Sequence, residues 1–166
     1  SNSGDFNTTN DFRRVSIIKD PKTGGSAATA TTLRGVKAIL LSGSPGSFTI
    51  DEKISQASTG AVGRVVEFDS TNKILYYMQT RFNNFGLDTN GNQTAFSGTN
   101  TITGADSGAT GTPSTSTSTV DNVSFTSGYA ASELDHDSGD VIYAENRAPI
   151  TRASDQTENV KLVIEF

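Results

Sequence analysis

The sequence predicts an all-β fold: a β-sandwich-like core built from N- and C-terminal strands, carrying an inserted small β-barrel-like module. Three observations support this. Ser, Thr and Gly are abundant, and these residues favour strands and turns. Hydrophobic residues make up 33% of the chain and charged residues 19%, both low for an ordinary helix-containing domain. The apolar runs are short and follow the two-residue period of strands.

Two pairs of segments are predicted to form the core, which spans residues 1–43 and 127–166. The predicted core strands are residues 12–19, 33–41, 140–146 and 160–166. In the closing strand, one face would carry Val160, Leu162, Ile164 and Phe166. A short helix over residues 27–33 is the alternative before the second strand. Residues 1–11 contain no initiator Met or signal-peptide pattern, so we expect the chain to be part of a longer protein.

The inserted module is predicted over residues 44–126, where Gly, Ser, Thr and Asn dominate. Residues 65–68 and 74–78 flank a polar turn and predict a β-hairpin. Residues 112–119 consist of Thr, Pro and Ser without apolar alternation, which predicts a flexible, exposed loop.

A short pattern occurs twice in this module, at a spacing of 48 residues. It reads F-x5-I-x2-A-x-[ST]-G-A-x-G and begins at Phe48 and again at Phe96. The glycines predict a strand, a tight turn and a returning strand in each copy. A duplicated hairpin in a small barrel and chance similarity between Gly/Thr-rich segments both account for it.

Charge and composition exclude several classes of partner. The net charge is −5, and the 13 basic residues are dispersed rather than clustered, so no nucleic-acid partner is expected. No apolar run approaches the roughly 20 residues that span a bilayer, so no membrane is expected. The absence of Cys excludes disulfides and thiolate chemistry.

Two local patterns resemble functional sites. Asp135, Asp137 and Asp140 lie near a Gly turn and offer oxygen ligands suited to Ca²⁺, but no Glu closes the loop, so a solvated turn is the preferred interpretation. His136, the single histidine, has no G-x-S-x-G elbow beside it in the sequence. The expectation is therefore no catalytic residue, no metal and no cofactor.

Four aromatic residues form the remaining candidate binding feature: Tyr76, Tyr77, Phe82 and Phe85. Such residues stack on sugar rings, although core packing is the simpler explanation in a β domain. A carbohydrate- or receptor-binding module is the alternative function that rests on them. A glycan-degrading enzyme is a third, less favoured interpretation, because scattered carboxylates always give accidental pairs.

The end of the chain carries the most specific motif. Residues 138–150 read SGDVIYAENRAPI, residues 152–158 read RASDQTE, and an apolar strand then ends in Phe166. This block, together with FRRVSIIKDP at residues 12–21, resembles the baseplate wedge subunit of T-even-type contractile-tailed phages, the subunit that forms a homodimer within each wedge. The resemblance covers both ends of the chain and leaves out about residues 24–129.

The resemblance implies a structural, non-enzymatic virion protein of the tail baseplate. Its partners would be other baseplate wedge proteins, with a possible homodimer, and assembly would take place in the host cytoplasm. The structural and assembly candidates are Tyr143, Glu145, Asn146, Arg147, Pro149, Arg152, Asp155 and Gln156. Their charges alternate in sign around a proline corner, so we expect them to fix that corner by charge-assisted hydrogen bonds; direct contact with a neighbouring subunit is the alternative.

Overall fold

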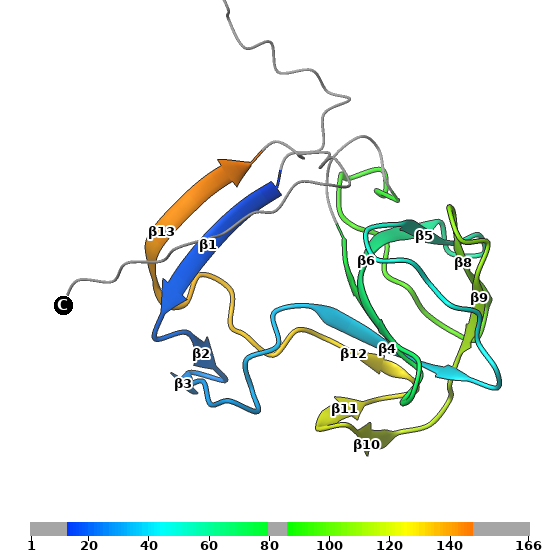
Figure 1. Ribbon diagram of the computed structural model, residues 1–166, viewed down its shortest axis with the longest axis horizontal. Helices are drawn as coiled ribbons and strands as arrows, with labels where there is room; N and C mark the ends of the chain where they lie inside the picture. Colours follow the sequence, from blue (N-terminus) through cyan, green and yellow to red (C-terminus); the bar gives the residue numbers. More distant parts are fainter. Residues whose placement is uncertain (1–12, 80–85, 148–166) are drawn as a thin grey trace, which may run out of the picture. The chain divides into compact units, whose positions relative to one another are not determined.

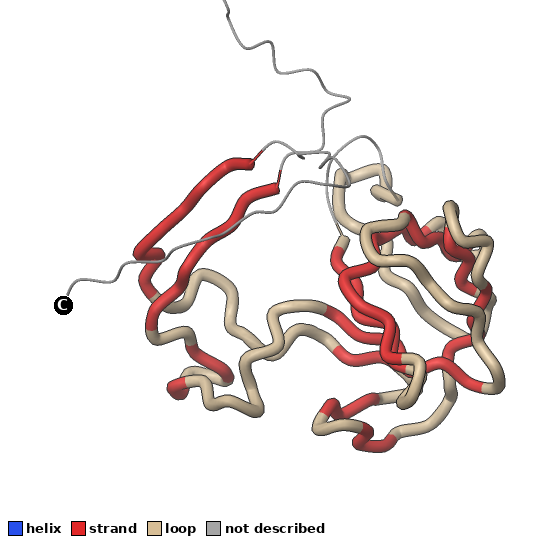
Figure 2. The backbone as a smooth tube through the Cα atoms, in the orientation of Figure 1, coloured by secondary structure: helices blue, strands red, loops and turns tan. Residues whose placement is uncertain are grey.

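A computed structural model describes the backbone of residues 13–79 and 86–147, and the side chains of residues 16–79 and 86–145. Its described elements are all strands joined by loops (Figures 1 and 2), which confirms the all-β prediction. The chain divides into two compact units, Ser1–Lys19 with Gly139–Phe166, and Asp20–Ser138. The predicted boundaries, at residues 43 and 126, lie inside the second unit.

The first unit contains a two-stranded antiparallel sheet, here called the ribbon. It consists of β1 (Arg13–Lys19) and β13 (Asp140–Arg147). Two of the four segments predicted to form the core thus share a sheet. The register shifts between Ile17 and Ile18, because a bulge leaves Ile142 without a counterpart on β1. The predicted closing strand at residues 160–166 lies outside the described residues.

The second unit contains a small closed barrel, which confirms the predicted barrel-like module. Six strands follow one another in the order β4-β7-β6-β5-β8-β9, and pairing of β9 with β4 closes the ring. The strands are β4 (Lys37–Ser42), β5 (Lys53–Gln56), β6 (Ala61–Asp69), β7 (Ile74–Met78), β8 (Ile102–Gly104) and β9 (Thr110–Pro113). An extra strand, β12 (Tyr129–Ala130), pairs with β4 outside the ring. The predicted hairpin is β6–β7.

Strand β4 belongs to this barrel, although the sequence placed its segment in the core formed by the chain ends. Its partners in the described residues are β7, β9 and β12. Strand β4 lies in the barrel because both of its faces are buried. Ile39 and Leu41 contribute to the barrel interior, whereas Ala38 and Leu40 contribute to a second apolar cluster. A strand with four consecutive buried residues needs a layer on each side.

The second cluster lies beneath a hairpin of β10 (Ser118–Val120) and β11 (Val123–Phe125). The Ser/Thr segment that leads into it was predicted to be a flexible loop. Its backbone instead makes specific hydrogen bonds: Ser114 N–H donates to Leu40 O (2.8 Å), and Ser116 O accepts from Gly128 N–H (2.9 Å). Backbone pairing, which does not depend on side-chain type, explains order in a segment without apolar alternation.

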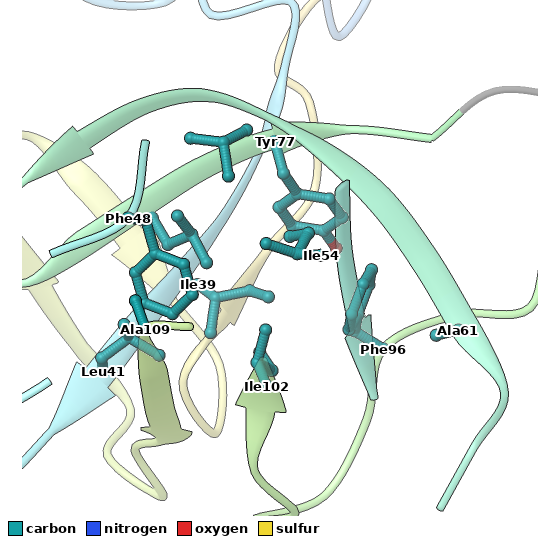
Figure 3. Packing of buried hydrophobic residues seen from close by; sticks show 11 residues of the cluster. Ile39, Leu41, Phe48, Ile54, Ala61, Tyr77, Phe96, Ile102 and Ala109 are labelled. Atoms are coloured by element: carbon teal, nitrogen blue, oxygen red, sulfur yellow. The ribbon is translucent and has the colours of Figure 1, made fainter. Parts of the chain in front are cut away.

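The repeated sequence pattern corresponds to a repeated structure. Hairpin β5–β6 pairs Ile54 with Gly63, and hairpin β8–β9 pairs Ile102 with Gly111, the same register 48 residues later. The two hairpins join through β5 and β8. Six matching apolar residues lie in one core cluster (Figure 3): Phe48 and Phe96, Ile54 and Ile102, Ala61 and Ala109. The matched positions therefore have the same structural roles.

A short hairpin precedes the barrel. It is formed by β2 (Lys22–Thr23) and β3 (Ser26–Ala27). The segment over residues 27–33, for which a short helix was the alternative, contains no helix in the structure. Among the described residues, no helical segment has the length and hydrophobicity that a membrane span requires.

Candidate functional site

The exposed apolar side chains of the described residues concentrate on the ribbon. Eight large hydrophobic side chains are exposed in these residues, and five belong to β1 and β13: Ile17, Ile18, Val141, Ile142 and Tyr143. The other three, Leu33, Ile50 and Met78, are spread over the second unit. Single exposed apolar side chains are ordinary on protein surfaces, but a cluster of them marks an interaction site.

Both faces of the ribbon carry apolar side chains. Residues opposite each other in an antiparallel pair share a face, so Ile17 lies beside Tyr143, and Ile18 beside Val141. Successive residues of a strand point to opposite faces, so these two pairs lie on different faces. A two-stranded sheet is marginally stable in water by itself. The ribbon is therefore an element that gains stability when another chain segment covers it.

The structure describes part of the predicted corner motif. The Tyr143 hydroxyl donates a hydrogen bond to Glu145 Oε2 (2.7 Å), which links two residues on one face of β13. Asn146 and Arg147 end β13, in register with Arg14 and Arg13 of β1.

The remaining corner candidates, Pro149, Arg152, Asp155 and Gln156, lie outside the described residues. The role of the corner therefore remains a prediction.

The predicted aromatic strip is divided between two apolar clusters. Tyr77 is 4% exposed and lies inside the barrel, where its ring meets Phe96 edge to face at 5.0 Å (Figure 3). Tyr76 faces the opposite side of β7 and packs on the cluster beneath the β10–β11 hairpin. Phe82 and Phe85 lie outside the described residues. The two tyrosines therefore cannot stack on one sugar ring.

The acidic turn has a structural role at one of its three carboxylates. Asp135 accepts hydrogen bonds from Gly24 N–H (3.0 Å) and Gly25 N–H (2.7 Å), one at each oxygen. These hydrogen bonds hold the pKa of Asp135 below its usual range. Asp135 thus fastens the β2–β3 hairpin to the segment that leaves the barrel. No group of three or more His, Asp or Glu residues is placed to hold a metal ion in the described part of the chain.

Sequence reasoning missed a buried carboxylate at Glu52, which is 1% exposed. Its Oε1 accepts from Thr49 N–H (2.6 Å) and the Ser107 hydroxyl (2.7 Å), and its Oε2 accepts from Asp106 N–H (3.0 Å) and Ser107 N–H (2.9 Å). Burial by itself raises the pKa of this carboxyl, but the hydrogen bonds from Ser107, Thr49 and Asp106 outweigh burial and lower it. Gly104 leaves room for the carboxylate, since a Cβ there would lie 2.6 Å from an oxygen.

Gln56 has a similar role at the first hairpin. This side chain is fully buried, and its Oε1 accepts from Ser97 N–H (3.0 Å) and the Thr59 hydroxyl (2.9 Å), while its Nε2 donates to Asn100 O (2.8 Å). Each buried polar side chain thus ties one repeat to the other. In the sequence, both residues lie among polar neighbours and resemble solvated loop positions, so no local signal marks them.

Comparison with known proteins gives one match. Residues 90–166 match a family described as Bacteriophage T4, Gp8. The match includes the ribbon strand β13 and reaches into the barrel as far as β8, which lies within the residues that the motif resemblance left out. No curated protein and no solved structure matches the chain.

Proposed function

We propose that this chain, a T4-type baseplate wedge subunit of the Gp8 family by its residues 90–166, acts through protein–protein contacts made by its ribbon during tail assembly. The matched family is one of structural phage baseplate proteins, which supports the virion tail as the location of the chain. One observation carries the proposal: five of the eight large exposed apolar side chains lie on β1 and β13.

The physical basis is removal of apolar surface from water. Fully burying an Ile or Val side chain contributes about 1.5–3 kcal/mol relative to its exposed state. Val141 and Ile142 are each 62% exposed, so a partner that covers them gains a large part of that amount at each. Association also has an entropic cost, so several such side chains are needed together. The ribbon provides them on two short strands.

The proposal includes three finer statements. The partners are other baseplate wedge proteins, and a second copy of this chain is one of them. Assembly takes place in the host cytoplasm. The chain acts without catalysis, in keeping with a structural family. The alternative of a carbohydrate-binding module has no support from Tyr77, because its ring is enclosed by the barrel core.

The test compares two exposed isoleucines. Ile142, 62% exposed, lies on β13, and Ile50, 61% exposed, lies in a barrel loop. Ile142→Ser should weaken binding of purified neighbouring wedge proteins from the same phage by about 10- to 100-fold, the equivalent of about 1.5–3 kcal/mol. Ile50→Ser should leave binding within about twofold. Calorimetry measures the affinities, and analytical ultracentrifugation measures self-association.

Equal effects of the two substitutions would contradict a role for the ribbon. Binding that both variants retain in full would do the same. Thermal unfolding of each variant identifies any loss of binding that results from unfolding rather than from loss of the contact.

A further inference from the structure

The two repeat hairpins meet through matched residues. Strands β5 and β8 pair in antiparallel orientation, with Ser55 directly opposite Thr103. These two residues match each other at the 48-residue spacing of the repeat. In a two-fold symmetric interface every contact occurs twice with the partners exchanged, and a residue on the axis meets its own equivalent. A pseudo-two-fold axis therefore passes between the hairpins at this pair.

A polar site occurs twice under this symmetry. In each site, one side-chain oxygen accepts from the backbone N–H that follows the Phe of one repeat and from a hydroxyl in the turn of the other repeat. The donors are Thr49 N–H (2.6 Å) and the Ser107 hydroxyl (2.7 Å) at Glu52 Oε1, called the first polar site, and Ser97 N–H (3.0 Å) and the Thr59 hydroxyl (2.9 Å) at Gln56 Oε1, called the second. The repeat spacing relates the two N–H groups to each other, and likewise the two hydroxyls, with the repeats exchanged.

The acceptors of the two sites come from different positions of the repeat. Glu52 matches Asn100, and Gln56 matches Gly104. The first repeat therefore supplies both acceptors, one from each position. The Asn100 side chain is exposed, and Gly104 leaves the space that the Glu52 carboxylate occupies.

Backbone donors explain why one acceptor is a carboxylate and the other an amide. Val65 N–H donates to Glu52 O (3.0 Å). The residue that matches Val65 is Pro113, which has no N–H, and Asn100 O accepts from Gln56 Nε2 (2.8 Å). The second polar site thus uses an NH2 group as well as an oxygen. The first contains donors only, which suits the acceptor-only side chain of Glu52.

We propose that the carboxylate of the first polar site can be supplied from position 104 as well as from position 52, as the second site is supplied from position 56. The distances fit. A Cβ at position 104 would lie 2.7 Å from the Glu52 carboxyl carbon. Within a Glu side chain, two carbon–carbon bonds separate the same two atoms by about 2.5 Å. The φ of Gly104 is not positive, so its strand backbone accepts a side chain.

Moving the carboxylate between the two positions tests this exchange. Glu52→Ala removes the acceptor from four buried donors and should lower the Tm of the full chain by at least about 5 °C. Gly104→Glu alone should also lower the Tm, because two carboxylates would then compete for one site. In the Glu52→Ala background, however, Gly104→Glu should raise the Tm by at least about 5 °C. The effect of one substitution thus reverses its sign with the residue at position 52.

The matched control combines Glu52→Ala with Gly104→Leu, which fills the space without an acceptor. This variant should melt no higher than Glu52→Ala. Acid titration gives a second measurement. The stability gained by Gly104→Glu over Glu52→Ala should be lost as pH falls below about 4.3, because the carboxylate that accepts the hydrogen bonds becomes protonated, whereas the difference between the Leu control and Glu52→Ala should stay constant.

Rescue by Leu as large as rescue by Glu, or no rescue by Glu, would overturn the exchange of positions. If Glu52→Ala does not fold, a cooperative melting transition that returns only with Gly104→Glu supports it, and no transition in either double variant counts against it. These outcomes do not depend on the partner contacts of the ribbon, because every residue of the two polar sites lies in the second unit.

Discussion

Replacing Glu52 by Gln removes the charge from a buried carboxylate while keeping its size. The Gln side chain keeps one oxygen, which accepts hydrogen bonds from the donors around one of the two carboxylate oxygen positions. At the other position its NH2 group faces N–H groups, which are also donors. Two buried donors then lose their acceptor, at about 1–3 kcal/mol each. We therefore expect Glu52→Gln to lower the free energy of unfolding by about 3 kcal/mol, or about 10 °C in Tm for a unit of this size.

The effect should depend on pH with a defined sign. The folded-state pKa of Glu52 is lowered, so the carboxylate contributes stability above the unfolded-state value of about 4.3, and this contribution is lost as pH falls through the folded-state pKa. The difference between the two proteins should thus be constant near neutral pH and shrink below about pH 4.3. Urea unfolding followed by circular dichroism at several pH values measures it.

The matched control is Glu67→Gln, at an exposed position of β6 in the same barrel. A surface substitution of this kind should change stability by less than about 0.5 kcal/mol. Equal effects of both substitutions at pH 7, or a Glu52→Gln difference that stayed constant down to pH 2, would contradict the role of the buried charge.

Three further experiments test the barrel and its attachment. Gly128→Ala should lower the free energy of unfolding by at least about 2 kcal/mol, because φ is 81° and a Cβ would meet a backbone carbonyl. Gly43→Ala, at φ 66° with open space around it, should lower it by about 1 kcal/mol. Equal losses in thermal unfolding would contradict the steric explanation. Ile54→Ala and Ile102→Ala should each lower the free energy of unfolding by about 2–5 kcal/mol, since both side chains are fully buried at matched positions. The two losses, measured by chemical denaturation, should agree within about 1 kcal/mol. A larger difference would contradict equivalent roles of the two residues. Asp135→Ala should speed exchange of the two glycine amides that it binds while the barrel melts as before; unchanged exchange would show that the carboxylate does not hold the β2–β3 hairpin.

The hairpin repeats show how far local sequence information reaches. Strand and turn positions in the repeats are local properties, set by alternation around glycines such as Gly60 and Gly108, both with positive φ. Sequence alone left duplication and chance similarity open. The barrel register favours a duplicated hairpin, because Ile54 and Ile102 occupy equivalent places in one core. That equivalence depends on contacts between segments far apart in the chain.

The sequence by itself determined the all-β class and the similarity of residues 90–166 to the Gp8 family, since these follow from alternation, turn residues and a specific motif. Only the tertiary structure decided that β4 lies between two apolar layers and that Glu52 is buried. It also decided that Tyr77 is enclosed in the barrel, away from any ligand surface. The physical reason is that burial and hydrogen-bond partners come from distant segments, and a short window of sequence contains neither.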